Sequence, residues 1–245
     1  MRADAAPLLI AWSGGKDCTL ALREIQRGGE YAVAALLTTV TAGYDRVSMH
    51  GVRRSLVRAQ AASLGLPLHE VEIPPVASNE EYEARMDAAI GVLRRRTPGL
   101  VGCAFGDLFL EDVRAYRERM LARAGLRAVF PLWGRNTAAL ARELTALGYR
   151  ARVVCVDAHA IPAALAGREY DGTFLRELPG SADPCGENGE FHTFVYDGPG
   201  FARPISCAAG EIVVRDERFV FADLVQPSSA AGVDAEAVAA ARPAS

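Results

Sequence analysis

Ser13-Gly14-Gly15-Lys16-Asp17-Cys18 is the stretch that decides the fold of this 245-residue chain. It follows residues 8–12, a short apolar run of strand length, and it precedes residues 19–27, whose apolar side chains recur at near-helical spacing. A strand, a glycine turn and a helix start are therefore expected in direct succession. This arrangement presents free backbone N–H groups and the positive end of a helix dipole to an anion, and a phosphate is the expected ligand.

The residue types of this turn suit a phosphate. Gly14 and Gly15 let the backbone come close to a ligand and adopt conformations that other residues avoid. Lys16 is the only lysine among the 27 Lys and Arg residues, and its mobile ammonium can follow phosphate oxygens. Asp17 would lie in the first helical turn, where it can cap N–H groups or face a magnesium ion. The alternative is a plain turn with one lysine left by chance, which the flanking strand and helix disfavour.

Two other phosphate-binding loops do not fit this stretch. A Walker A loop needs glycine at position 10 and Ser or Thr at position 17, where the chain has Ile10 and Asp17. The dinucleotide fingerprint G-x-G-x-x-G, started at Gly14, needs glycine where the chain has Lys16. The stretch resembles instead the pyrophosphate loop S-G-G-x-D-S/T of the ATP pyrophosphatases, which release AMP and pyrophosphate. Cys18 departs from the last position of that pattern and puts a thiol where the pattern has a hydroxyl.

The composition indicates a globular chain without a strong charge field. Half of the residues are hydrophobic and the net charge is −3, so nucleic acid is not expected as a partner. The five cysteines contain no C-x-x-C pair, which argues against a disulfide framework and against a zinc or redox site. Reduced thiols in a cytoplasmic protein are expected. Neither a signal peptide nor a membrane span, which takes roughly 20 apolar residues, is expected.

The first half of the chain alternates strand-like and helix-like segments. Further strands are expected over residues 32–40, 68–73, 99–105 and 127–130, and further helices over 51–64, 80–94 and 111–124. Strands separated by helices imply right-handed crossovers and a parallel sheet. The sequence therefore predicts a doubly wound α/β domain, an ATP-binding domain assigned to residues 1–130.

The pattern changes after Pro131. A helix is expected over residues 137–147, a strand over 150–156, a short helix near 162–166, and a hairpin over 211–225 with its turn at 215–218. These elements predict a second, smaller α+β domain over residues 131–225, which we expect to bind the substrate. Residues 226–245 are rich in Ala, Ser and Pro and are expected to form a flexible tail.

Polar residues follow several strands of the predicted parallel sheet. The glycine turn follows the first strand, His50 follows the second, and Gly106 and Asp107 follow the fourth. Ligands of such sheets bind beyond the carboxyl ends of the strands, where the winding reverses. Taken singly, His50 is more often a surface histidine and Asp107 a helix cap. Their common place on one rim makes them candidates to line a nucleotide site.

Residues 183–193, with the sequence DPCGENGEFHT, are the second informative stretch. Glu187 and Glu190 could bind a cation or ammonium, and His192 could shuttle a proton near neutral pH. The alternative is an ordinary turn that leads into a strand, but the density of functional groups exceeds what a turn needs. Metal ligation has no second cluster with ligand spacing to support it.

Together these motifs resemble the diphthine–ammonia ligase family. The resemblance covers about residues 8–225 and rests on residues 13–17, 106–107, 131–133 and above all 186–193. It implies the adenine nucleotide alpha-hydrolase-like fold of the PP-loop ATP pyrophosphatase superfamily. It also implies an ATP-dependent amidation. A carboxylate attacks the α-phosphate of ATP and pyrophosphate departs, which gives an acyl adenylate. Ammonia then displaces AMP.

The same resemblance assigns roles to residues. Contacts to ATP, with magnesium at Asp17, are implied for Ser13, Gly14, Gly15, Lys16, Asp17, Cys18, His50, Gly106 and Asp107. Contacts to the substrate or ammonia are implied for Trp133, Glu187, Asn188, Glu190, His192 and Thr193. The residues expected to take part in catalysis are Lys16, Asp17, Glu187 and His192.

The sequence leaves the acceptor carboxylate open, and it can be a protein or a small molecule. One alternative function is a sensor that binds ATP or AMP without turnover, with Cys18 marking a weakened loop. Another is a related PP-loop enzyme that adenylates RNA or another small carboxylate. Release of pyrophosphate with a carboxylate partner would separate an enzyme from a sensor. A homo-oligomer is also left open.

Overall fold

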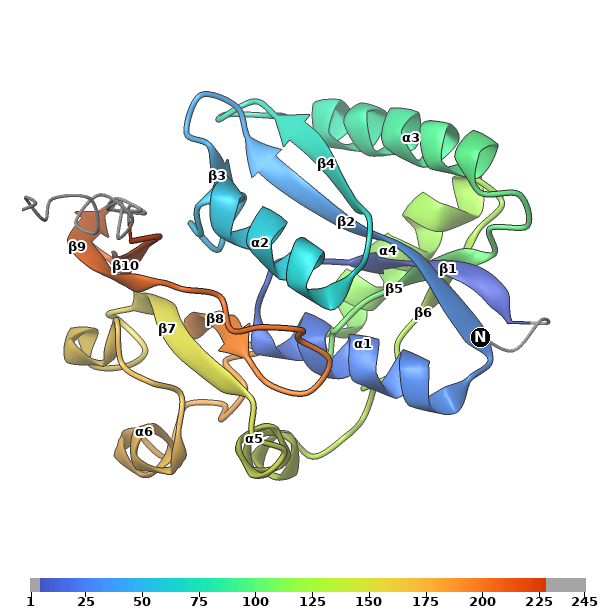
Figure 1. Ribbon diagram of the computed structural model, residues 1–245. Coiled ribbons are helices and arrows are strands. Elements are labelled where there is room, and N and C mark those ends of the chain that lie inside the picture. The colour runs from blue at the N-terminus through green and yellow to red at the C-terminus, as the bar shows by residue number, and fades with distance from the viewer. Residues whose placement is uncertain (1–4, 228–245) are drawn as a thin grey trace, which may run out of the picture.

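The computed structural model describes residues 5–227, which form two sheets with helices packed around them (Figure 1). The first sheet contains β1 (Ala6–Ala11), β2 (Tyr31–Thr41), β3 (Arg46–Val47), β4 (Leu68–Ile73), β5 (Gly102–Ala104) and β6 (Arg127–Val129). Its strand order is β3-β2-β1-β5-β6, and β4 also pairs with β2. All pairings are parallel except that of β2 with β3. The chain moves outward from β1 to β2 and β4 and then returns to the other side of β1, so the winding reverses beside β1.

Helices cover both faces of the first sheet. α1 (Lys16–Gly28) and α2 (Arg54–Leu64) pack on the face that carries Leu8 and Ile10 of β1. α3 (Asn79–Arg96) and α4 (Glu111–Arg123) pack on the face that carries Leu9. Because successive strand residues point to opposite faces, a strand covered on both sides is apolar throughout. The predicted doubly wound α/β architecture is confirmed.

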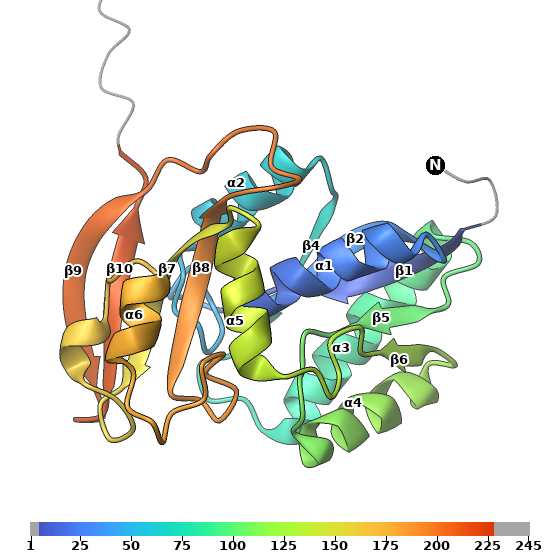
Figure 2. The same ribbon diagram turned by 90° about the horizontal axis from the view of Figure 1, so that it is seen from below.

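The second sheet is antiparallel, with the order β8-β7-β10-β9. It contains β7 (Arg150–Asp157), β8 (Phe191–Asp197), β9 (Ala208–Arg215) and β10 (Phe219–Val225). One face packs against α5 (Thr137–Ala146), the 3-10 helix η1 (Ala163–Leu165) and α6 (Gly172–Glu177), which lie on its outer side (Figure 2). The other face packs Phe194 and Tyr196 against α1 and α2. The predicted smaller α+β unit is confirmed, and α1 and α2 lie between the two sheets.

Some elements differ from the expected ones at their ends. The helix expected from residue 51 begins at Arg54, because Met49 and Gly51 have φ angles of 67° and 70° and form a turn before it. The strand expected over residues 99–105 pairs only at Gly102–Ala104. The sequence does not predict β3, which has two residues, or α6, a short helix capped by Asp171 in a stretch rich in Gly and Asp. The expected hairpin is confirmed as β9 and β10.

The division of the chain at residue 130 stays a prediction. Residues 228–245, which make up nearly all of the predicted tail, lie outside the described residues. None of the helices within residues 5–227 combines the length and the apolar character that crossing a membrane requires.

Candidate active site

The glycine turn joins β1 to α1 at the place where the winding of the first sheet reverses. Gly14 has a φ of 83°, which favours glycine. A Cβ on Gly15 would lie 3.1 Å from the carbonyl oxygen of Thr193. Strand β8 holds the turn from the other side: the Val195 N–H donates to the Gly14 carbonyl at 2.9 Å, and the Lys16 N–H donates to the Thr193 hydroxyl at 3.1 Å. Both sheets therefore shape the turn.

Gln60 of α2 also supports the turn, and it is not among the site residues predicted from the sequence. Its buried side chain accepts a hydrogen bond from the indole N–H of Trp12 at 3.0 Å. Its amide N–H groups donate to the carbonyl oxygens of Gly14 at 3.0 Å and Val195 at 2.5 Å. The signal available in the sequence is a glutamine on the apolar face of a helix, where a buried polar residue must find partners.

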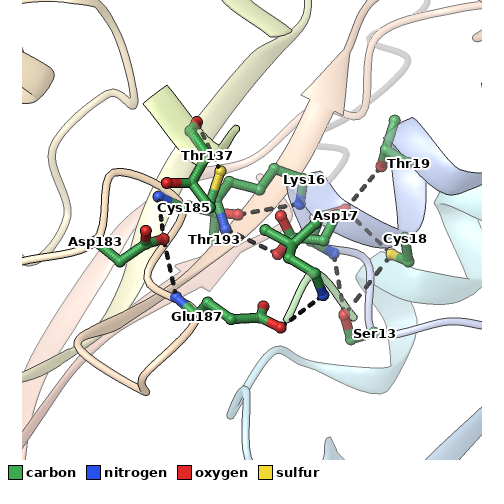
Figure 3. A network of polar contacts seen from close by, with 12 residues as sticks. Ser13, Lys16, Asp17, Cys18, Thr19, Thr137, Asp183, Cys185, Glu187 and Thr193 are labelled. Carbon is green, nitrogen blue, oxygen red and sulfur yellow. Dashed lines mark hydrogen bonds and ion pairs between the residues drawn. The ribbon is translucent and has the colours of Figure 1, made fainter. Parts of the chain in front are cut away.

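Buried Lys16 and partly exposed Asp17 form an ion pair in the first turn of α1 (Figure 3). Lys16 Nζ lies 2.8 Å from Asp17 Oδ2 and 5.3 Å from the centre of the Phe191 ring. Burial alone would lower the pKa of the Lys16 ammonium, but the charge of Asp17 and its hydrogen bond with Lys16 outweigh burial and raise the pKa, and Glu187 adds to the rise. The side chain is therefore a fixed positive charge that points toward the second sheet.

The Cys18 thiol occupies the position where the related loops have a hydroxyl. It donates to the Gly15 carbonyl at 3.1 Å and lies 3.7 Å from the hydroxyl oxygen of Ser13. The Thr19 hydroxyl donates to the same Gly15 carbonyl at 2.8 Å. Burial raises the pKa of Cys18, which keeps it a neutral thiol. The thiol at this position thus makes a hydrogen bond within the turn.

A cavity of about 460 Å³ opens beside the turn, within the usual range for small-molecule sites. One side is apolar and consists of residues from the strand ends, α3 and α4: Leu37, Tyr82, Met86, Ile90, Phe105, Met120 and Leu121. The other side carries polar groups from both halves of the chain: Ser13, Asp17, Ser48, His50, Asp107, Glu187 and His192. The cavity can therefore hold a ligand with one apolar part and one charged part.

Most of the predicted site residues border this cavity or the turn. Those on the cavity wall are Ser13, Asp17, Cys18, His50, Gly106, Asp107, Glu187 and His192. Gly14, Gly15, Lys16 and Thr193 make up the turn and its contacts with β8. Asn188, Glu190 and Trp133 do not line the cavity. Trp133 instead packs 4.7 Å from the Arg114 guanidinium and 5.8 Å from the Phe130 ring.

His50 and His192 lie next to each other at the cavity, with ring centres 4.3 Å apart. Burial lowers the pKa of His50 well below its ordinary value, and it lowers that of His192 to about 4, with Lys16 adding to both effects. Both rings are therefore neutral near pH 7. Among the described residues, Nδ1 of His50 is buried without a hydrogen-bond partner, so it is free to meet a ligand.

The Glu187 carboxylate joins the second half of the chain to the loop after β5. Its Oε1 accepts the backbone N–H groups of Leu108 at 2.7 Å and Phe109 at 3.4 Å. Burial raises the pKa of Glu187 to about 7, and the negative charges of Asp17 and Asp107 add to the rise. Glu187 can therefore exchange a proton near neutral pH.

Glu190 holds the shape of the loop that carries Glu187. Its buried carboxylate accepts the backbone N–H groups of Asp183 at 2.8 Å and Asn188 at 3.0 Å. It also accepts the side-chain amide of Asn188 at 3.0 Å. These bonds occupy both carboxylate oxygens, which places Glu190 and Asn188 behind the cavity wall.

The loop after β5 packs directly on the start of α1. A Cβ on Gly106 would lie 2.7 Å from the carbonyl carbon of Asp17, so only glycine allows this approach. Asp107 pairs with Arg117 of α4, with Nε and Oδ2 2.6 Å apart. The two residues predicted after the fourth strand thus lie beside the glycine turn, as the common rim implies.

The site offers one free ligand to a magnesium ion. Among residues 5–227, no group of three or more His, Cys, Asp or Glu residues could hold a metal ion. Within the same range, Oδ1 of Asp17 is buried without a hydrogen-bond partner in a residue that borders the cavity. Mg²⁺ commonly takes one or two carboxylates together with water and substrate phosphates. These residues therefore fit a magnesium ion that arrives with a nucleotide.

Known proteins resemble this chain over most of its length. The model of the diphthamide synthase N-terminal domain matches residues 7–128, and that of the diphthamide synthase C-terminal domain matches residues 136–222. A Danio rerio protein named diphthine–ammonia ligase is 26% identical over 224 residues, which cover 84% of this chain and 88% of that protein.

Two further relatives carry the same name. The Schizosaccharomyces pombe protein is 23% identical over 82% of this chain and 36% of its own length. The Homo sapiens protein is 30% identical over 46% of this chain and 44% of its own length. Two consecutive domain models together with the glycine turn and its cavity lead to one conclusion: the chain belongs to the diphthamide synthase family and is an ATP-dependent ligase.

Proposed function

We propose that this chain uses ATP to convert a carboxylate into an amide. A carboxylate oxygen attacks the α-phosphorus of ATP and pyrophosphate leaves, which yields an acyl adenylate. Ammonia then attacks the carbonyl carbon, AMP leaves, and the amine gives up a proton. The relatives are named for diphthine and ammonia, so diphthine is the acceptor we would test first. The observation that carries the proposal is the glycine turn, which opens on a cavity bordered by Glu187 and His192.

The two sides of the cavity suggest how ATP lies in it. The apolar side, with Met86, Ile90 and Phe105, suits the adenine base. The polar side suits the phosphates, because it borders the N-terminus of α1, where backbone N–H groups lack partners within the helix. In this orientation the α-phosphate lies between the apolar side and the turn, within reach of a second substrate.

Charge stabilisation at the turn is the main contribution we assign to the protein. Negative charge builds on the departing pyrophosphate, and preorganised N–H groups and nearby cations stabilise it. The Lys16 ammonium, held by Asp17 beside the turn, does not line the cavity, so its positive charge acts on the phosphates from behind the cavity wall. A magnesium ion held by Asp17 and the phosphates would neutralise further phosphate charge. The neutral imidazoles of His50 and His192 can exchange hydrogen bonds with phosphate or ribose without adding charge.

In this proposal Glu187 accepts the proton that the attacking amine gives up. Its carboxylate borders the cavity, and its pKa of about 7 lets it accept a proton at neutral pH. The proton then leaves with solvent before the next cycle. Glu190 and Asn188 act indirectly in this scheme, since they hold the loop that positions Glu187.

The test is formation of AMP and pyrophosphate by the purified chain. We would supply ATP, magnesium, ammonium and a diphthine-bearing protein, and omit each in turn. AMP that appears in equal amount to the amide, and only with all components, is the expected result. Tight ATP binding without AMP for any carboxylate would overturn the proposal in favour of a sensor, and pyrophosphate release with RNA alone would favour an RNA-adenylating enzyme.

We also infer that the chain works in the cytoplasm. All five cysteines are free thiols, and Cys18, Cys103, Cys155 and Cys185 are buried. Unpaired thiols are usual in reducing compartments. ATP and ammonium are also available there as substrates for the proposed reaction.

A further inference from the structure

A second cavity of about 500 Å³ adjoins the first. On one side it is lined by the ends of β2 and β3 and the turns beside them, including Tyr44, Arg46 and Met49. On the other side it is lined by the β9–β10 hairpin, including Val213 and Phe221. Nothing in the proposed handling of ATP uses this space.

The turn at residues 47–51 separates the two cavities. Val47 and Met49 line both of them, whereas Ser48 and His50 line only the first and Gly51 only the second. Met49 has a φ of 67° and its side chain is 80% exposed. A non-glycine residue in the left-handed region is strained, and such strain gathers at functional sites. Because no tight packing holds the Met49 side chain, it can move aside and join the two cavities.

We propose that the second cavity binds the body of the carboxylate acceptor, whose carboxylate reaches past Met49 to the α-phosphate. This inference rests on the proposed function, because that reaction needs two substrates to meet. ATP fills the first cavity, so the acceptor has to approach from a neighbouring space. The second cavity is a neighbouring space that shares Val47 and Met49 with the first.

The walls of the second cavity indicate the chemistry of the acceptor. Tyr44, Val213 and Phe221 offer apolar and aromatic surface, which suits an apolar stem. Arg215 also lines the cavity, and among the described residues it has no ion-pair partner. A free guanidinium attracts carboxylates, so it draws the carboxylate of the acceptor toward the cavity; the Asp216 carboxylate lines the same cavity, which therefore carries charges of both signs.

The second cavity has a firm frame. Asp223 of β10 pairs with Arg46 at 2.8 Å and with Arg53 at 2.6 Å, which ties the hairpin to the turn before α2. A Cβ on Gly51 would lie 2.7 Å from a ring carbon of Phe221, so the two segments touch. The site is therefore built by contacts between the halves of the chain.

Two neighbouring residues of β9 provide a matched test. Val213 lines the cavity, and Ile212 points to the opposite face of the same strand. Both are exposed, by 37% and 57%, so a tryptophan at either position is tolerated by the fold. We would measure binding of a fluorescent diphthine-bearing peptide in the presence of a non-hydrolysable ATP analogue, together with ATP affinity and AMP formation.

We expect Val213→Trp to raise the dissociation constant of the peptide at least tenfold and to leave ATP affinity within twofold. Ile212→Trp should change neither value. If Val213→Trp binds the peptide as tightly as wild type, the acceptor site is elsewhere, even where AMP forms and the proposed function holds. If wild type binds the peptide but makes no AMP, the proposed reaction is wrong. Comparison of peptide binding by Val213→Trp, Ile212→Trp and wild type still shows whether the second cavity is the binding site. If wild type does not bind the peptide, the second cavity is not a site for this acceptor and the inference is overturned, whereas AMP formation with another carboxylate would still support the proposed reaction.

Discussion

Replacement of Gly14 by alanine tests whether the glycine turn has the shape described above. Gly148 is its matched control, because both glycines have a φ of 83°. No atom lies within 4 Å of a Cβ added to Gly148. A Cβ on Gly14 would lie 2.7 Å from Oε1 of Gln60 and 3.2 Å from a ring carbon of Phe194. The two substitutions therefore share the backbone cost and differ in the steric one.

The structure sets the size of the difference. Alanine in the left-handed region lowers the free energy of unfolding by about 1–2 kcal/mol, and this loss is common to both variants. Gly14→Ala also needs Gln60 to move, and its amide makes three hydrogen bonds. Overpacking of this kind costs about 1–3 kcal/mol more. For a chain of this size each kcal/mol lowers Tm by about 2–4 °C, so Gly14→Ala should melt several degrees below Gly148→Ala.

Thermal melting and ATP titration of the two variants would measure the effect. Gly148→Ala should bind ATP as wild type does, because its site is remote from the turn. Gly14→Ala should bind ATP at least tenfold more weakly, since the displaced turn no longer presents its N–H groups. Equal stability and equal ATP affinity for the two variants would refute the assignment of the turn and of Gln60 as its support.

Three further substitutions test the surrounding contacts. Gln60→Leu keeps the volume but leaves a buried indole N–H and a strand carbonyl without partners. The free energy of unfolding measured in urea should therefore fall by about 2–4 kcal/mol, and a fall of less than about 0.5 kcal/mol would contradict this role of Gln60. Lys16→Met leaves the partly buried Asp17 carboxylate unpaired, so urea unfolding should show this variant to be less stable than Lys16→Met/Asp17→Asn; equal stabilities would mean that the two groups are not coupled. Glu187 has a folded-state pKa of about 7 against an ordinary value of 4.5, so its contribution to stability is full below pH 4.5 and is lost as the pH rises to 7. Glu187→Gln cannot ionise and should gain stability relative to wild type between pH 5 and pH 8, by roughly 1 kcal/mol after allowance for partial exposure; thermal melting that shows a pH-independent difference would contradict it.

The fold could be predicted from the sequence because each element is marked by residues that are close together in the chain. A continuous apolar run marks β1 as a strand covered on both faces. The two glycines and the following helix mark the turn. Because the carboxyl ends of parallel strands meet at one edge of the sheet, His50 and Gly106 are then expected to lie close together, although they are far apart in the chain. Each of these inferences needs only the residue types and the direction of the strands.

The direction of a side chain is harder to predict than its place in the fold. Lys16 is on the predicted turn, yet its ammonium pairs with Asp17 and points toward Phe191 rather than lining the cavity. Trp133 lies in a motif of the family, yet it packs on Arg114. Both outcomes depend on neighbours that come from other parts of the chain, which spacing within the motif does not report.

Gln60 shows why the glycine motif does not make the site by itself. The carbonyl of Gly14 accepts from the side chain of α2 and from the backbone of β8, and the Lys16 N–H donates to a threonine of β8. β8 begins within the 186–193 motif. The residues of this motif that contact the glycine turn therefore lie in the same strand as His192. The docking of the second sheet therefore sets the shape of the phosphate turn and brings Glu187 and His192 to the cavity in one step. A change that loosens this docking should weaken ATP binding and the proposed proton transfer together, because one set of hydrogen bonds supports both.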